Sequence, residues 1–337
     1  MEKQRCNMKN GSFIISLDFE MMWGALDLWT PEDYGKSNIE NVRTVIKRLV
    51  ETFNKYMVHS TFASVGLLML DSKEEAKLFT PSPIPSYLNS KRSPYNGELI
   101  DNIKNENLYF APDVISFLNS QEGVEVASHT FSHYYCWEEG QTIEQFESDI
   151  KTAIKVAKAK GICLKSIVFP RNQVFDEYLR VCSNYGFGVY RGVSPSFSKK
   201  PKSKLESVLQ RIGRLADAYV NIGGNSSIPY NSIDTTSSII NIPSSRFLRP
   251  FSRKLSFLDG LKFRRMKGEM IYAAKHGELY HLWWHPHNFG SNIEENFKFL
   301  EMILKCYQEC HIKYGMKSYT MNEFAKQMKQ DEYSSRS

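Results

Sequence analysis

Four polar clusters in this chain each follow an apolar segment that has the composition of a buried β-strand. The clusters are Asp18-Phe19-Glu20, Ser128–His133, Pro170-Arg171-Asn172 and His285-Pro286-His287-Asn288. Such apolar segments alternate with amphipathic helical segments along the chain, which predicts an α/β fold with parallel strands. Because the carboxyl ends of the strands lie at one face of an α/β barrel, we expect the four clusters to meet there.

The predicted elements follow from the spacing of apolar residues. Helices are predicted over 39–56, 143–159, 175–185 and 293–310, and short strands at 13–17, 60–65, 123–127, 167–170, 187–190 and 280–284. The segments 71–110 and 196–260 are irregular, which predicts two large insertions. We therefore expect a single barrel-like domain over 11–328, followed by a tail over 329–337.

The composition narrows the function classes. The 337 residues are 42% hydrophobic and 24% charged, which suits a sizeable core and excludes a disordered chain. A net charge of +6 is too small to predict nucleic-acid binding. The six cysteines contain no CxxC pair, which indicates reduced thiols. The N-terminal apolar run is only about five residues, shorter than a secretory signal or a membrane span, so we expect a cytoplasmic protein without a transmembrane segment.

Two clusters contain residue types that bind metals. Asp18 and Glu20 are two apart at a strand end, which points both carboxylates to the same side, as a metal ligand beside a general base requires. A helix cap or a loop salt bridge is the alternative. His129 and His133 have the i, i+4 spacing that can hold one zinc ion through two imidazoles, although two unrelated surface histidines would look the same.

The last cluster brings a titrating side chain to the same face. His285 is suited to protonating a departing amine near neutral pH. The alternative is a structural histidine packed among Trp283, Trp284 and Phe289. His285 and His287 also form a His-x-His pair like that of metal-dependent amidohydrolases. In amidohydrolases the pair normally lies on the first strand, whereas here it comes late in the chain.

Together the clusters resemble the polysaccharide deacetylase family, the NodB-homology family or, broadly, carbohydrate esterase family four. The resemblance rests on Asp18-Phe19-Glu20 as the first motif, Ser128–His133 as the second motif, and Thr61-Phe62 through Gly66 as the second strand. It spans roughly 11–290. The sequence around His285 is most similar to members of surface-glycan biosynthesis.

The resemblance implies a deformed (β/α) barrel and a role for each motif residue. Asp18 would be the general base and His285 the proton donor to the leaving group. Glu20, His129 and His133 would hold a divalent metal, most simply Zn²⁺. The third family motif is present only as Phe169-Pro170-Arg171-Asn172-Gln173, with its order changed, and would offer Arg171 as the partner of Asp18. The usual fourth motif has no clear counterpart.

The implied reaction is removal of an N-acyl group, by expectation acetyl, from an amino sugar in glycan or glycolipid precursor biosynthesis. An O-acetyl esterase, an amidohydrolase-type barrel enzyme and a catalytically inactive carbohydrate-binding module remain alternatives. Sugar contacts are expected from side chains near the strand ends, namely Trp23, Trp283, Trp284, His287 and Asn288, and aromatic core packing is the alternative for each tryptophan.

A basic segment suggests what carries the sugar. Residues 246–267 contain eight Lys and Arg, Arg264 and Arg265 among them, against the single acid Asp259. This pattern predicts either a solvated face or contacts to phosphate in a nucleotide- or lipid-diphosphate-linked sugar. The second interpretation leaves contact with a membrane surface open.

Overall fold

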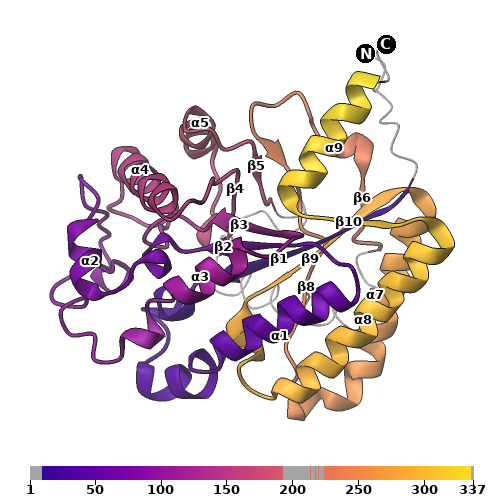
Figure 1. Cartoon of the computed structure of the whole chain (residues 1–337), viewed down its shortest axis with the longest axis horizontal. Helices are drawn as coiled ribbons and strands as arrows, with labels where there is room; N and C mark the ends of the chain where they lie inside the picture. Colours follow the sequence, from indigo (N-terminus) through magenta and orange to yellow (C-terminus); the bar gives the residue numbers. More distant parts are fainter. Residues whose placement is uncertain (1–9, 193–212, 214–216, 218, 220–223, 335–337) are drawn as a thin grey trace.

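A computed structural model of the chain describes residues 10–192, 213, 217, 219 and 224–334 (Figure 1). The expected insertion at 196–260 therefore lies partly outside the described residues. The strands are β1 Ser12–Phe19, β2 Ser60–Ser64, β3 Val124–Ser128, β4 Ser166–Ile167, β5 Val189–Tyr190, β6 Ile228–Pro229, β7 Ile240–Asn241, β8 Arg246–Phe247, β9 Glu278–Trp284 and β10 Lys317–Tyr319. The helices are α1 Val42–Lys55, α2 Lys73–Leu78, α3 Pro112–Asn119, α4 Ile143–Ala159, α5 Asp176–Asn184, α7 Asp259–His276, α8 Ile293–Tyr314 and α9 Met321–Ser334.

The strands form one curled sheet in the order β6-β9-β1-β2-β3-β4-β5-β7, with β10 beside β1 and β8 beside β9. Strand β6 runs antiparallel to β9, and the other recorded pairs are parallel. In the described part of the chain the outermost strands β6 and β7 do not pair with each other, so the barrel stays open. The predicted α/β class and deformed barrel are confirmed.

Strand β1 pairs with β2, β9 and β10 and is buried along its whole length. Alternate side chains point to opposite faces. Phe13, Ile15 and Leu17 belong to the larger core cluster, which contains most of the buried helix residues. Ile14 belongs to a second cluster with Met321 and Phe324 of α9. Because Ile14 and Asp18 share one face of the strand, Asp18 lies inside the barrel, at the end of β1 away from Ile14.

The long helices pack on the outer face of the sheet, and α7 lies beside α8 (Figure 1). Helix α4 begins with a capping box, in which the Thr142 hydroxyl accepts from Gln145 N and the Gln145 side chain accepts from Thr142 N. This box fixes the start of the helix that carries Asp149. No described helix combines the length and the apolar character that crossing a bilayer requires.

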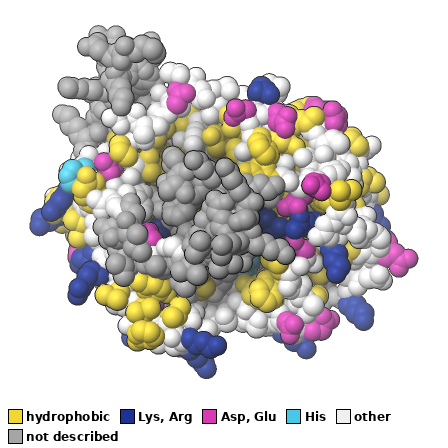
Figure 2. Space-filling view, turned by 180° about the vertical axis from the view of Figure 1, so that it is seen from behind, with side chains coloured by type: hydrophobic (Ala, Val, Ile, Leu, Met, Phe, Trp, Pro, Cys, Tyr) yellow, Lys and Arg dark blue, Asp and Glu magenta, His cyan; other side chains and the backbone are white. Residues whose placement is uncertain are grey.

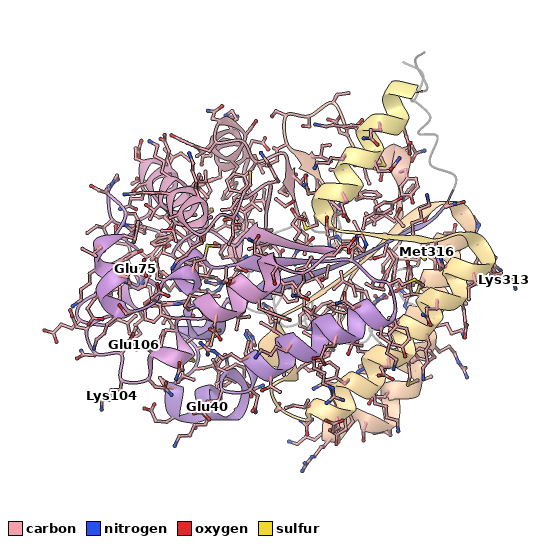
Figure 3. The ribbon with its side chains drawn as sticks, viewed as in Figure 1. Glu40, Glu75, Lys104, Glu106, Lys313 and Met316 are labelled. Carbon is pink, nitrogen blue, oxygen red and sulfur yellow. The ribbon has the colours of Figure 1, made fainter. Side chains whose placement is uncertain are left out.

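The irregular segment 71–110 contains α2 and short helical turns, and connects β2 with α3. Its labelled side chains Glu75, Lys104 and Glu106 lie at the edge of the molecule, far from Lys313 in the last turn of α8 and Met316 between α8 and β10 (Figure 3). At the C-terminus, α9 continues to Ser334, so the segment expected to be a tail from residue 329 begins inside a helix.

Candidate metal and catalytic site

The carboxyl ends of β1, β3 and β9 bring three of the predicted site residues together around a fourth, Glu20. Glu20 Oε2 lies 2.8 Å from His133 Nε2 and 3.4 Å from His129 Nε2. Glu20 Oε1 lies 3.4 Å from His285 Nε2. All but His285 are at least nine-tenths buried, so the cluster lies inside the protein and reaches the surface through His285.

Glu20 is held against the backbone of the turn that follows β1. A Cβ on Gly24 would lie 2.1 Å from Glu20 Cδ, so only glycine leaves room for the carboxylate. Burial alone would raise the pKa of Glu20, but the charges of His285 and His133 and hydrogen bonds from His129 and His133 hold it well below its usual range. Glu20 is therefore a carboxylate at neutral pH.

His129 follows β3 and presents one particular nitrogen to Glu20. Its Nδ1 lies 2.8 Å from the carbonyl oxygen of Val168, which can only accept, so Nδ1 carries the proton. Nε2, the atom that faces Glu20, donates to the carboxylate when the ring carries a second proton and offers its lone pair to a metal when the ring is neutral. A backbone carbonyl that fixes the tautomer in this way is typical of histidines that bind metals.

His133 lies at the end of a strained turn. The backbone φ of His133 is 58° and that of Thr130 is 63°, values that residues other than glycine rarely adopt. Asp149 of α4 holds the turn, because it accepts from Phe131 N at 2.6 Å and Ser132 N at 3.0 Å. Burial raises the pKa of Asp149 to about 6. Burial also lowers the pKa of His133, which favours the neutral imidazole that a metal requires.

Asp18 is held by Arg191, which follows β5. Arg191 Nη1 lies 2.7 Å from Oδ1 and Nη2 lies 2.8 Å from Oδ2, a two-pronged pair. Ser16 Oγ accepts from the same guanidinium at 3.0 Å, and His281 Nε2 lies 2.8 Å from that hydroxyl. Burial would raise the pKa of Asp18, but the charges of Arg191, His129 and His285 lower it below its usual value.

Arg171, expected as the partner of Asp18, forms other contacts. Arg171 comes directly after Pro170, and its backbone φ is 55°. This backbone conformation directs the side chain toward Asp27, whose carboxylate accepts from Arg171 Nη2 at 2.7 and 2.9 Å. Its guanidinium also lies over the ring of Tyr135, at 4.4 Å. The expectation was wrong because the changed order of the third motif moves this side chain to the rim, and Arg191 occupies the expected position.

His285 and His287 lie one above the other beside Glu20. Their rings are nearly parallel, at 17°, with centroids 4.9 Å apart. His285 Nε2 is also 3.8 Å from Asp18 Oδ2, so it faces both carboxylates. His287 is buried, and burial lowers its pKa to about 3.

The three tryptophans expected to contact sugar differ in exposure. Trp23 is buried, and its indole donates to the carbonyl oxygen of Tyr109 at 2.6 Å, while Trp284 is buried against Phe53. Both side chains therefore belong to the hydrophobic core. Trp283 is partly exposed and packs edge-on to His285, so it remains a candidate for contact with a substrate.

An aromatic pair that the sequence did not suggest lies beside His287. Trp29 is half exposed and stacks on Tyr34 with centroids 5.1 Å apart. Tyr34 meets the edge of His287 at 5.5 Å and lies 3.4 Å from the side-chain nitrogen of Asn288. Asn288 therefore lies next to this pair.

The basic segment divides into buried and exposed side chains. Arg265 is buried beside Glu269 and donates to the carbonyl oxygen of Gly224, and Arg246 forms a further ion pair with Glu269. Arg265 is therefore structural, since its charge is already paired. Arg264 is exposed. On the face seen in Figure 2, Lys and Arg among the coloured residues are scattered around the rim, interspersed with Asp and Glu.

The donor set fits a divalent metal. One carboxylate and two imidazoles with ligand atoms within 4.8 Å of one another are a common protein contribution to a catalytic zinc site, which leaves a position for water. Ligand atoms on one tetrahedral zinc are about 3.3 Å apart, close to the 3.4 Å between Glu20 Oε2 and His129 Nε2. The fold and this site define an open α/β barrel with a carboxylate–histidine centre at the carboxyl ends of its strands.

More particularly, the fold is that of the polysaccharide deacetylases. A candidate polysaccharide deacetylase from Mycobacterium smegmatis superposes with a TM-score of 0.59 and 11% identity, covering 97% of this chain and 92% of that chain. A second candidate from Pseudomonas aeruginosa PAO1 has a TM-score of 0.53 and 12% identity, covering 95% and 91%. Puue allantoinase matches with a TM-score of 0.53 and 10% identity, covering 97% and 93%.

No model of a protein family and no curated protein matches the sequence. The resemblance read from the motifs is thus confirmed at the level of the fold. At 10–12% identity the solved structures define the fold, and the chemistry rests on the site itself.

Proposed function

We propose that the protein is a metal-dependent hydrolase that removes an N-acyl group, in the first instance acetyl, from an amino sugar. The observation that carries the proposal is the convergence on Glu20 of two metal-binding imidazoles on one side and of His285 on the other, with Asp18 beside them. General base, metal ligands and general acid are then within one cluster of side chains. The fold shared with polysaccharide deacetylases supports the choice of a carbohydrate amide.

Glu20, His129 and His133 would hold the cation. A divalent ion bound there would polarise the acyl carbonyl and lower the pKa of a nearby water, and zinc suits the two nitrogen ligands and one oxygen ligand. Asp18 is ionised and held by Arg191, so it can accept a proton from that water as the new C–O bond forms. Arg191 fixes the carboxylate in a single orientation, because both of its oxygens are engaged.

His285 would complete the reaction. The C–N bond breaks when the nitrogen receives a proton, and His285 is the partly exposed imidazole that faces both carboxylates. The products are the free amine and acetate. Trp283, partly exposed beside His285, offers a face on which the sugar ring could pack.

The proposal is tested by acetate release from N-acetylated amino sugars by the zinc-loaded protein. Asp18→Asn should retain zinc, because Asp18 is not a ligand in this assignment, and should lose turnover by about a hundredfold or more. An Asp18→Asn protein that is free of metal would mean that the two carboxylates exchange roles. A wild-type protein that binds zinc and releases no acetate would support a binding module instead.

An O-acetyl esterase is the second candidate. The same water, base and metal would attack an ester, and an alcohol leaving group depends less on protonation than an amine does. Side-by-side kinetics on N-acetyl and O-acetyl versions of one sugar decide between them. A higher kcat/KM for the amide supports the deacetylase.

The sugar is proposed to be linked to a diphosphate, and the structure reduces the number of basic side chains that could contact the phosphate. Arg265 is paired inside the protein, so a phosphate would meet exposed side chains such as Arg253, Lys254 and Arg264. A nucleotide- or lipid-diphosphate-linked substrate should then show a KM that rises with salt. A KM that stays constant from low to high salt would contradict the diphosphate.

A further inference from the structure

The carboxylate of Glu20 faces a histidine pair with each of its two oxygens. Oε2 faces His129 and His133, as described above. Oε1 lies 3.4 Å from His285 Nε2 and 3.9 Å from His287 Nε2. Both arrangements bring one oxygen and two imidazole nitrogens together within 4.8 Å, and Glu20 is the residue that they share.

The second group has the geometry of a metal site in its own right. The 3.4 Å between Glu20 Oε1 and His285 Nε2 is close to the ~3.3 Å between two ligands of one tetrahedral zinc. The rings of His285 and His287 stack at 17°, and one ligand nitrogen of each ring lies within 4.8 Å of the other and of a Glu20 oxygen. The 3.9 Å from His287 Nε2 to Glu20 is too long for a hydrogen bond.

The hydrogen bonding of the His287 ring is incomplete. His287 is 7% exposed, and its Nδ1 is buried without a hydrogen-bond partner among the described residues. Neither ring nitrogen therefore has a hydrogen bond among the described residues, and a coordinate bond at Nε2 would satisfy one of the two. Tyr34 holds the ring edge-on, and Asn38 donates to the His287 carbonyl at 2.9 Å, so the backbone and the ring are fixed next to Glu20.

We propose that Glu20, His285 and His287 bind a second divalent cation, with Glu20 bridging the two ions. Carboxylate-bridged metal pairs in hydrolases are about 3.5–4 Å apart. The second ion should bind more weakly than the first, by about tenfold or more, because it enters beside an existing 2+ charge.

The second ion has a consequence for the reaction that rests on the proposed function. A metal on His285 Nε2 occupies the lone pair that would carry the proton for the leaving amine. The singly loaded protein is then the active form, and zinc in excess inhibits it.

Zinc content tests the site without reference to activity. Apoprotein is equilibrated with buffered free Zn²⁺ over a range of concentrations, and bound zinc per chain is measured by elemental analysis. Wild type should reach two equivalents in two steps. His287→Phe, which keeps a ring against Tyr34 and removes both nitrogens, should stop at one equivalent, and Glu20→Gln should lose affinity in both steps.

Surface histidines supply the control. His276 is exposed at the end of α7, and His276→Ala should still bind two equivalents. A single step to one equivalent in wild type, or two equivalents in His287→Phe, would overturn the second site. Loss of the second equivalent in His276→Ala would assign it to the surface. Circular dichroism establishes that each variant is folded before its zinc content is compared.

Kinetics then test the consequence. If the protein releases acetate, zinc above one equivalent should lower the wild-type rate at least tenfold, and His287→Phe should show no such inhibition relative to its own rate at one equivalent. If it releases no acetate but binds two equivalents, the second site stands and the proposed function fails. An active wild type with two equivalents and no inhibition would contradict the blocking of His285.

Discussion

Both carboxylate oxygens of Asp18 are engaged by the guanidinium of Arg191, at 2.7 and 2.8 Å, although the two residues are 173 positions apart. The pair is buried, with Arg191 fully covered and lying over the ring of Trp283 at 4.3 Å. A carboxylate fixed in this way keeps its charge inside the protein and keeps its direction. The predicted general base is therefore positioned by a residue that lies outside the four polar clusters.

Replacing Arg191 should disable the base. Arg191→Met leaves Asp18 buried without its partner, which costs about 3–5 kcal/mol of stability and raises the pKa of the carboxyl group. The kcat for acetate release should fall by about a hundredfold or more, while bound zinc is retained. Arg171→Met is the matched control, because Arg171 pairs with Asp27 at the rim. A larger loss of kcat in Arg171→Met than in Arg191→Met would reverse the assignment.

The same pair should be visible in the pH dependence of stability. The folded-state pKa of Asp18 is lowered, so its contribution is fully present above the ordinary aspartate pKa and is lost as pH falls through the folded value. The difference in unfolding free energy between wild type and Asp18→Asn should be constant from pH 7 to about pH 5 and shrink below about pH 4. Denaturant titrations of the two apoproteins at each pH measure it. A difference that grows toward acid pH contradicts the lowered pKa.

Gly24 should be essential for the metal site although it contacts no metal. In Gly24→Ala the new methyl group would overlap the carboxylate of Glu20, so the side chain must move away from His129 and His133. Zinc affinity should drop by at least tenfold. Gly268→Ala is the control, since it lies inside α7 with nothing within 4 Å of the added Cβ. That change should leave zinc binding intact and raise stability by about 0.5–1 kcal/mol. Equal zinc affinity in the two variants would contradict the packing of Glu20 on Gly24.

His285 should matter most when the leaving group needs a proton. His285→Ala is expected to keep the tightly bound zinc, because His129 and His133 remain, and to lose amide hydrolysis by about a hundredfold. An activated aryl acetate, whose leaving group departs without protonation, should be hydrolysed at a rate much closer to that of wild type. If both substrates suffer equally, the acid is another residue.

The sequence predicted those site residues that follow directly after a recognisable strand. Asp18 and Glu20 alternate at the end of a buried strand, and His129 and His133 follow the next strand but one in the sheet, so strand ends alone bring them together. The open barrel followed from the same alternation of strands and helices. The weak strand at 187–190 also exists, as the two residues of β5.

Other features could not be predicted, for physical reasons. Arg191 follows a two-residue strand, and no spacing relates it to Asp18. The direction of Arg171 depends on its positive φ, which a sequence does not state. Trp23 and Trp284 look the same in sequence whether they lie in the core or in a pocket.

The position of Asp149 in the sequence indicates a buried carboxylate. It falls on the apolar stripe of its helix, beside Phe146 and Ile150 and one turn before Ala153, and a carboxylate there must have partners. The partners are the backbone N–H groups of the turn that carries His133.

The most direct test of the account is the zinc content and turnover of His129→Ala beside wild type, at limiting zinc that fills only the tighter site. The account predicts that wild type holds one equivalent and releases acetate. The variant, folded by circular dichroism, should hold no zinc at that concentration and lose nearly all turnover, because one of the three protein ligands is gone. A His129→Ala protein that keeps one tightly bound zinc and the wild-type rate would show that Glu20, His129 and His133 are not the catalytic metal site.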